Sequence, residues 1–381
     1  MKSTVLNYPR KATPAAASSD LPANATATDT TLVGLDWGTN TSCLMASPLT
    51  GTGTTVSEQI PTVIGTAAEN VLEGVLPGNA RTLYGRDAQK YRMHLTMHHP
   101  LRSGVIADLP MARLYAQHLR TRLPDDAGEI RAVIGMPASS DLVARENART
   151  VVQGLFHKVL FVPEPFLAAL GYRDETRLTD PEYQDPVLNS LYIDIGAGST
   201  DVCLVQGHYP TVEDQLSAPF AGDAVDQIIH EAILAAYPDC GLTLTRVKEL
   251  KEKHSFAMSE GTAAPVIATI IVGGKPRKID ITAQICAGCD ALLQKVFAMT
   301  CQLLARSNPD LVTELLQNVI VTGGGSLIKG FGVALQTKLL EEGFENPRVR
   351  TLGENYKNYV ALGALKAARQ AKDHQWQNLI G

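Results

Sequence analysis

Two copies of one local pattern, half a chain apart, constrain the fold of this sequence more than any other feature. In residues 32–45, a short apolar run ends in Asp36, and a turn rich in glycine and threonine leads into a second apolar run. Residues 191–205 repeat this order, with Asp194 at the end of the first run. Each copy is typical of a β-hairpin. Because the aspartates are 158 residues apart (194 minus 36), the repeat predicts two similar α/β halves that each begin with such a hairpin.

Strands and helices alternate along the remainder of the chain, which favours the α/β class. Capping residues predict a helix that runs to about His157, and we expect another helix to begin at Leu327. Apolar runs predict strands at 131–136, 159–162, 266–272, 278–281 and 318–322. Helical patterns are found at 166–171, 224–236, 246–256 and 283–307.

Composition excludes several classes of protein. With 34 Lys+Arg against 39 Asp+Glu the net charge is −5, so no strong positive field points to direct binding of nucleic acid. No apolar stretch approaches the roughly 20 residues of a transmembrane segment. Six cysteines in 381 residues do not make a disulfide scaffold, and they favour reduced thiols in the cytoplasm.

The first 31 residues differ in composition from the remainder of the chain, because seven Ala, six Thr and three Ser make up half of them. Such a segment cannot bury enough apolar surface to offset the entropy lost on ordering its backbone. We therefore interpret residues 1–31 as a disordered tail and expect the folded chain to start near Leu32. The remaining length of about 350 residues predicts two domains.

The paired hairpins have the composition of a phosphate site. A turn of Gly, Ser and Thr presents backbone N–H groups and hydroxyls without bulky side chains, which suits a polyphosphate. A carboxylate at the end of the preceding strand can hold Mg²⁺ through its waters. The alternative is that these turns only close their hairpins. Two facing copies in equivalent places favour a clamp around a phosphate chain.

A third glycine-rich turn, at residues 323–326, follows a predicted strand. Three consecutive glycines let the backbone approach a flat ligand, and a helix that begins after them would favour an anion. A tight turn from strand to helix also requires glycine, so this signal is weak when taken alone.

Six motifs in a fixed order carry a family resemblance. They are Asp36-Trp37-Gly38-Thr39-Asn40, Ser103-Gly104-Val105-Ile106-Ala107-Asp108, Val133-Ile134-Gly135-Met136-Pro137, Glu164-Pro165, Asp194-Ile195-Gly196-Ala197-Gly198-Ser199-Thr200-Asp201 and Gly323-Gly324-Gly325-Ser326. This set resembles the motifs of the actin superfamily of ATPases, and within it the bacterial actins of the MreB and MamK type. The resemblance covers about residues 32–370.

The resemblance implies an actin-like fold, in which two similar α/β domains with duplicated mixed five-stranded sheets enclose a nucleotide cleft. Domain I would span residues 32–178, with a small subdomain inserted at about 64–108. Domain II would span residues 179–381, with a small subdomain inserted at about 223–282.

The same resemblance implies which residues would bind Mg²⁺ and ATP or ADP. Asp36 and Asp194 would approach the metal, with Asp194 also part of the catalytic set, and Glu164 would orient the attacking water. Because Pro165 suits the first position of a helix, Glu164 would lie at the positive helix end and stay ionised. The nucleotide would contact Gly38, Thr39, Asn40, Thr41, Gly196, Ala197, Gly198, Ser199, Thr200, Gly222, Asp223, Lys251, Gly323, Gly324, Gly325 and Ser326.

Three positions depart from the family pattern. Trp37 is bulkier than the small or aliphatic residue usual there, and Asn40 replaces a common Ser or Ala. Lys248 stands where MreB-like proteins tend to have a ribose-binding Glu, although Lys251 matches the next polar contact. The phosphate side of the site is therefore better supported than the nucleoside side.

The function implied by the resemblance is that of a cytoskeletal ATPase, which polymerises with ATP in the cytoplasm and disassembles through slow hydrolysis. Its partners would be further copies of itself and accessory proteins of an organelle or cargo, as in MamK-like magnetosome organisation. A non-polymerising ATP-binding adaptor similar to FtsA or PilM is the alternative, and a small-molecule kinase is a third reading. At the C-terminus, Trp376, Leu379 and Ile380 could form an amphipathic end that touches a membrane, but we expect the terminal segment to dock on the first domain instead.

Overall fold

The computed structural model describes residues 30–51, 53–125, 127–138, 140–257 and 264–379. The segment expected to be a disordered tail lies outside the described residues as far as residue 29. The first strand begins at Thr30, two residues before the expected start of the folded chain.

The first half of the chain builds a mixed sheet around the first hairpin. Its strands are β1 (Thr30–Trp37), β2 (Thr41–Pro48), β3 (Val56–Pro61), β9 (Glu129–Met136), β10 (Lys158–Pro163) and β18 (Gln377–Asn378). Their order is β18-β10-β9-β1-β2-β3, and β1 pairs antiparallel with β2 and parallel with β9. The central strands are buried on both faces, as expected where helices cover both sides of a sheet.

The second half repeats this arrangement. Its strands are β11 (Ser190–Ile195), β12 (Thr200–Val205), β13 (Gln215–Ala218), β16 (Val319–Thr322) and β17 (Val349–Thr351). They follow the order β13-β12-β11-β16-β17, with β11 antiparallel to β12 and parallel to β16. Each strand has a counterpart in the first sheet, to which β18 adds a sixth strand. The expected α/β class with two similar halves is confirmed.

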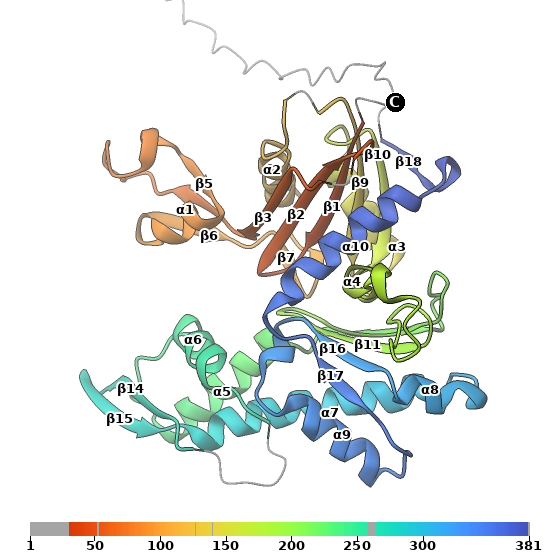
Figure 1. Cartoon of the computed structure of the whole chain (residues 1–381). Helices are drawn as coiled ribbons and strands as arrows, with labels where there is room; N and C mark the ends of the chain where they lie inside the picture. The colour runs from red at the N-terminus through yellow and green to blue at the C-terminus, as the bar shows by residue number, and fades with distance from the viewer. Residues whose placement is uncertain (1–29, 52, 126, 139, 258–263, 380–381) are drawn as a thin grey trace, which may run out of the picture.

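Two helices pack against each other between the sheets (Figure 1). α4 (Glu164–Tyr172) and α10 (Tyr356–Gln370) share one apolar core with residues of both sheets. A Cβ on Gly363 would lie 1.8 Å from the carbonyl oxygen of Leu167, and one on Gly171 would lie 1.9 Å from that of Tyr359. Only glycine allows backbones to approach so closely, and these contacts fix how α4 and α10 cross.

The C-terminal segment packs on the first sheet, although the expected boundary at residue 178 assigned it to domain II. Helix α10 contacts β1, β2 and β9, and β18 pairs with β10. Trp376 and Leu379 are buried in this packing, as expected of a docked chain end, and Ile380 lies outside the described residues. No helix in the described residues has both the length and the apolarity needed to cross a membrane.

Further helices cover the outer faces of the two sheets. On the first sheet these are α2 (Leu109–Arg120) and α3 (Leu142–Val152), and on the second they are α7 (Thr282–Leu304), α8 (Val312–Leu316) and α9 (Phe331–Glu341). In each half, the layers are therefore helices, sheet and the shared α4–α10 pair.

Two smaller units project to the same side of the molecule (Figure 1). The first contains β4 (Ile64–Ala67), β5 (Thr82–Tyr84), α1 (Gly85–Lys90) and β6 (Leu95–His98), followed by the short strands β7 (Leu101–Arg102) and β8 (Val105–Ile106). The second contains α5 (Gly222–Ala236), α6 (Leu244–His254), β14 (Ile267–Val272) and β15 (Lys275–Asp280). They occupy the stretches where insertions were expected.

Two predicted helix boundaries are wrong, and glycine explains both. Helix α3 ends at Val152 rather than near His157, because Gly154 has a φ of +73°. The helix expected from Leu327 begins only at Phe331, after a 3₁₀ turn and Gly330 with a φ of +76°. Neither conformation continues a right-handed helix.

Candidate functional site

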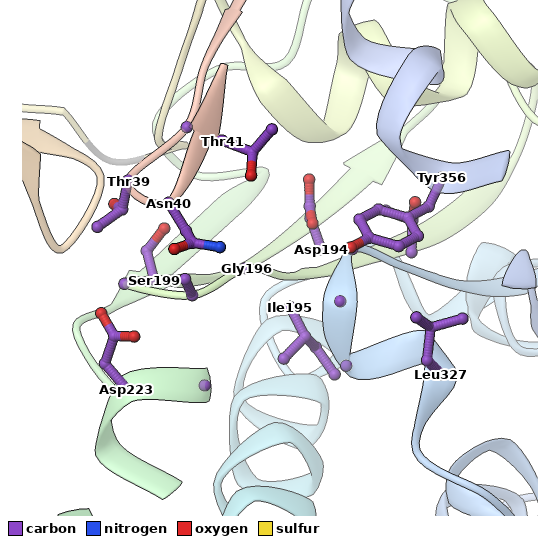
Figure 2. Close-up of a pocket in the computed structure, with 18 of the residues that line it drawn as sticks. Thr39, Asn40, Thr41, Asp194, Ile195, Gly196, Ser199, Asp223, Leu327 and Tyr356 are labelled. Atoms are coloured by element: carbon purple, nitrogen blue, oxygen red, sulfur yellow. The ribbon is translucent and has the colours of Figure 1, made fainter. Parts of the chain in front are cut away.

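A cavity of about 340 Å³ opens between the two hairpins and is lined by both halves of the chain (Figure 2). Most of the predicted site residues line it: Asp36, Gly38, Thr39, Asn40, Thr41, Glu164, Asp194, Gly196, Ala197, Gly198, Ser199, Gly222, Asp223, Lys251, Gly323, Gly324 and Gly325. Thr200 and Ser326 do not. Their hydroxyls each donate a 2.7 Å hydrogen bond to a backbone carbonyl, that of Phe220 and that of Gly323. These two residues therefore stabilise the turns from behind.

The first turn, between β1 and β2, is held chiefly by hydroxyl groups. The Thr62 hydroxyl donates to the carbonyl oxygen of Gly38 at 2.7 Å. The Thr39 hydroxyl accepts a 2.9 Å hydrogen bond from the backbone N–H of Gly104. The turn thus depends on side chains that lie outside the glycine pattern.

The second turn, between β11 and β12, is held by backbone groups. The N–H of Gly196 donates to the carbonyl of Ser199 at 2.9 Å, which closes the turn. The N–H groups of Gly222 and Asp223, at the start of α5, donate to the carbonyls of Gly196 and Ala197 at 3.1 and 2.8 Å. The turn and the N-terminus of α5 therefore form one rigid unit.

The two hairpins meet at a point where no side chain would fit. A Cβ on Gly198 would lie 2.7 Å from the Thr39 hydroxyl oxygen and 2.8 Å from the backbone of Ser103. Separations below 3.0 Å are not tolerated when the neighbour is backbone. Gly198 therefore sets how closely the two turns approach.

Carboxyl groups gather on the floor of the cavity. Asp36, Asp194 and Glu164 line it, and Asp201 is buried beside them, where it accepts a hydrogen bond from the N–H of Ala138 at 2.8 Å. The surrounding protein removes water from Asp36 and raises its pKa to about 7. Desolvation, together with the charges of Asp201 and Asp36, raises the pKa of Asp194 to about 8. The floor binds protons readily and would be stabilised by a cation.

The donor set fits a magnesium ion held largely by water and phosphate. Within the described part of the chain, no three His, Cys, Asp or Glu side chains gather closely enough to hold a metal ion directly. Neither Asp36 nor Asp194 forms an ion pair with any described residue. Mg²⁺ commonly binds one or two carboxylates and keeps several waters, so these two carboxylates are suitable partners.

Glu164 lies at the first position of α4, with Pro165 behind it. A Cβ on Gly135 would lie 2.9 Å from the Glu164 side chain, so Gly135 makes room for it. The helix end was expected to keep Glu164 ionised, but in the protein without a cation its surroundings act in the opposite direction. Desolvation, followed by the charges of Asp36, Asp201 and Asp194, raises the pKa of Glu164 well above its usual value.

The three glycines at residues 323–325 have different roles. A Cβ on Gly323, whose φ is +75°, would lie 2.4 Å from a carboxylate oxygen of Asp194, and one on Gly325 would lie 2.4 Å from the Ile195 side chain. Both glycines therefore serve packing against β11. A Cβ on Gly324 would meet only the Tyr356 hydroxyl, at an ordinary contact distance of 3.6 Å, so of the three glycines Gly324 leaves the most room for a ligand against its backbone.

Several cavity residues carry no sequence signal that reveals them. Tyr356 and Lys357 begin α10, and Tyr356 points into the cavity towards Asp194 (Figure 2). Burial, and then the charge of Asp194, raises the pKa of the Tyr356 hydroxyl to about 12. Lys251, by contrast, was expected from the sequence: it donates to the carbonyl of Gly222 at 2.7 Å and pairs with Asp226 at 2.9 Å, so it links α5 to α6.

Comparisons with known proteins agree with this geometry. Residues 30–375 match the family model described as MreB/Mbl protein. The actin-like protein MamK of Paramagnetospirillum magneticum is 30% identical over 302 residues, which cover 77% of this chain and 82% of MamK. A structure of the MamK double helical filament has a TM-score of 0.79 at 28% identity and covers 90% of this chain and 99% of its own. A non-polymerising MamK mutant bound to AMPPNP has a TM-score of 0.63 at 27% identity, covering 89% and 98%.

Proposed function

The chain belongs to the MreB/Mbl family, and from that premise we propose that it is an actin-like ATPase that forms filaments with ATP and disassembles when the ATP is hydrolysed. One observation carries the proposal. Two glycine-rich hairpin turns from opposite halves meet over carboxyl groups that no described cation neutralises. That arrangement matches the chemistry of a magnesium polyphosphate.

In this proposal, ATP or ADP occupies the cavity with its phosphates between the two turns. Asp36 and Asp194 would hold Mg²⁺ through its waters, and this ion would neutralise charge on the phosphates. The N-terminus of α5, at Gly222 and Asp223, adds a partial positive charge beside the second turn. Gly324 is the position where the nucleoside can lie against backbone. The AMPPNP-bound MamK mutant supports a nucleotide in this fold.

Hydrolysis would depend on Glu164. The family resemblance gives this residue the task of orienting the attacking water, and its place at the start of α4 directs the carboxyl group into the cavity. Once a cation is bound, the neighbouring aspartates no longer oppose ionisation, and the Glu164 carboxylate can accept a hydrogen bond from water. Since phosphoryl transfer relies on positioning and charge neutralisation, a slow ATPase needs no further group.

Filament formation is proposed from the similarity to MamK, of which a double helical filament structure is known. Repetition of one head-to-tail contact that does not close on itself gives an open filament. We further propose a cytoplasmic protein whose filaments organise magnetosomes or another cargo through accessory proteins. We also propose that the two domains divide near residue 178, and that α10 and β18 belong to the first domain.

Light scattering combined with pelleting tests this function. The purified protein should scatter light and sediment after addition of Mg-ATP, and both signals should fall as phosphate is released. Magnesium with ADP provides the control, because it should bind without sustaining filaments. A protein that binds ATP but stays monomeric at high concentration would instead be an adaptor of the same fold.

A further inference from the structure

Lys248 on α6 reaches across the cavity to the first hairpin turn. Its Nζ donates a 2.7 Å hydrogen bond to Oδ1 of Asn40, and both residues line the cavity. The two positions are 208 residues apart and lie on opposite sides of the opening. Within the described part of the chain, this is the one hydrogen bond that joins residues 222–282 to residues 30–178, and no ion pair does so.

The far end of the cleft is held much more firmly. There the N–H of Ala138 donates to Asp201, and helices α4 and α10 pack between the two sheets. If the halves rotate apart about this end, the buried contacts at the far end can persist while the contact at the opening breaks. The Lys248–Asn40 bond is therefore placed where it opposes opening with the greatest leverage.

No neighbouring carboxylate of a described residue pairs with Lys248, so its ammonium group can bind Asn40. The nearby carboxylate of Asp226 pairs with Lys251 at 2.9 Å, and Lys248 forms no ion pair with a described residue. His99, on the first half of the chain, is exposed to solvent. Partial desolvation, and then the positive charge of Lys248, lower the pKa of the His99 ring, while the negative charge of Asp223 acts in the opposite direction. The charge of Lys248 thus acts on the first half of the chain.

We propose that Lys248 and Asn40 form a latch that holds the two halves closed over bound nucleotide and thereby sets the rate at which nucleotide leaves. The latch rests on the proposed function, because it presupposes that nucleotide occupies the cavity. Lys248 acts as a positioning residue: it touches the turn that faces the phosphates and takes no part in hydrolysis. A hydrogen bond with a charged donor near solvent has the strength to change the dissociation rate roughly 3- to 10-fold.

The test follows release of N-methylanthraniloyl-ADP from the full chain after addition of excess unlabelled ADP, with Mg²⁺ and at low protein concentration. Lys248→Met and Asn40→Ala should each speed release roughly 3- to 10-fold. The double variant should be no faster than the faster single variant, because both changes remove the same contact. Asn40→Asp adds a negative charge beside the phosphate turn as well as an ion pair with Lys248, so its release rate should rise further when Lys248→Met removes that pair.

Lys253→Met is the matched control, since Lys253 is an exposed lysine of the same helix with no partner among the described residues. Its release rate should equal that of the unchanged protein. Equal rates for Lys248→Met and Lys253→Met, or single effects that multiply in the double variant, would overturn the latch while leaving the proposed function intact. A protein that binds no nucleotide would refute the proposed function, and the latch with it.

Discussion

The two hairpin turns share one sequence pattern but are held in place by different means. Hydroxyl groups make two of the hydrogen bonds that hold the first turn: Thr62 donates to the carbonyl of Gly38, and Thr39 accepts from the N–H of Gly104. One backbone bond, from the N–H of Thr62 to the carbonyl of Asn40 at 3.0 Å, adds to them. Backbone groups hold the second, which is closed on itself and joined to the start of α5. The first turn also exposes Asn40 to a contact from the other half, whereas the second turn is buried at Ser199 and Thr200.

This difference indicates that the two turns tolerate different changes. A turn held by side chains can be altered by deleting one hydroxyl, and its position can respond to events elsewhere. A turn held by backbone is insensitive to such deletions but cannot accept an added Cβ at its contact point. We therefore expect the first turn to adjust between open and closed states, and the second to act as the fixed reference.

Removal of either aspartate at the end of a hairpin strand should have the largest effect. Asp36→Asn and Asp194→Asn should each weaken Mg-ADP binding by about 3 kcal/mol, roughly 100-fold, because a charged partner of the metal is lost. Calorimetry with Mg-ADP measures this loss, and Asp239→Asn, at an exposed position, is the control. Losses that differ by more than tenfold would show that the two hairpins do not share the metal equally.

The same Asn variants should stabilise the nucleotide-free protein at pH 8, because each removes a half-buried charge that forms no ion pair with a described residue. A melting temperature that rises while Mg-ADP affinity falls would separate lost metal binding from misfolding. A lowered melting temperature would contradict the claim that the charges of Asp36 and Asp194 destabilise the nucleotide-free protein.

A methyl group at the contact between the hairpins should have the next largest effect. Gly198→Ala places a Cβ 2.7–2.8 Å from Thr39 and Ser103, so the turns must separate. Overpacking of this kind costs about 1–3 kcal/mol, and we expect nucleotide affinity to fall by roughly tenfold or more. Gly241→Ala, where a Cβ meets nothing within 4 Å, is the matched control for the loss of a glycine. If Gly198→Ala and Gly241→Ala bind nucleotide equally well, the close contact between the two turns at Gly198 is refuted.

Deletion of one hydroxyl behind the first turn should have a smaller effect. Thr62→Val leaves the carbonyl of Gly38 without its 2.7 Å partner, which costs about 1–2 kcal/mol of stability and up to roughly tenfold in affinity. Thr150→Val, at an exposed position on α3, is the control. Urea unfolding and nucleotide titration measure both quantities. If Thr200→Val behind the second turn weakens binding more than Thr62→Val, the comparison between the turns fails.

The smallest predicted effect is a release of protons on binding. At pH 7, Asp36 and Asp194, with pKa values of about 7 and 8, are partly protonated, and Mg²⁺ binds the ionised form. Binding of Mg-ADP should therefore release about one proton at pH 7 and fewer at pH 9. Calorimetry in buffers with different ionisation enthalpies measures this number, which should fall in Asp194→Asn.

The same shifts determine how stability depends on pH. Both folded-state pKa values lie above the ordinary value of 3.8, so the folded protein binds more protons than the unfolded chain. The stability of the nucleotide-free protein should fall as pH rises from about 4 through 8, and Mg-ADP should remove most of this dependence. A melting temperature that rises across this range would contradict the raised pKa values.

Much of the fold could be predicted because the two hairpins combine short apolar runs with glycine-rich turns. Helix ends were harder: Gly154 and Gly330 adopt positive φ values, and the sequence does not reveal which glycines will do so. The docking of the chain end at β18 was expected, whereas the placement of α10 on the first sheet has no local signal. It depends on backbone contact between α4 and α10, a feature of the assembled protein.

In the candidate site too, some residues could be predicted from the sequence and others could not. Motif reasoning located the residues of both turns, whereas Thr200 and Ser326 face away because their hydroxyls bond to nearby carbonyls. Tyr356 belongs to no motif and reaches the cavity only through the docking of α10. The helix end at Glu164 was visible in the sequence, whereas the burial and the three neighbouring carboxyl groups that raise its pKa were not.

The most direct test of the proposed function compares Glu164→Ala with the unchanged protein, following phosphate release and light scattering in one sample after addition of Mg-ATP. We predict that the variant releases almost no phosphate, assembles as readily as the unchanged protein and forms filaments that persist. Unchanged phosphate release in the variant would contradict the role of Glu164. Failure of the unchanged protein to assemble would contradict the filament-forming ATPase.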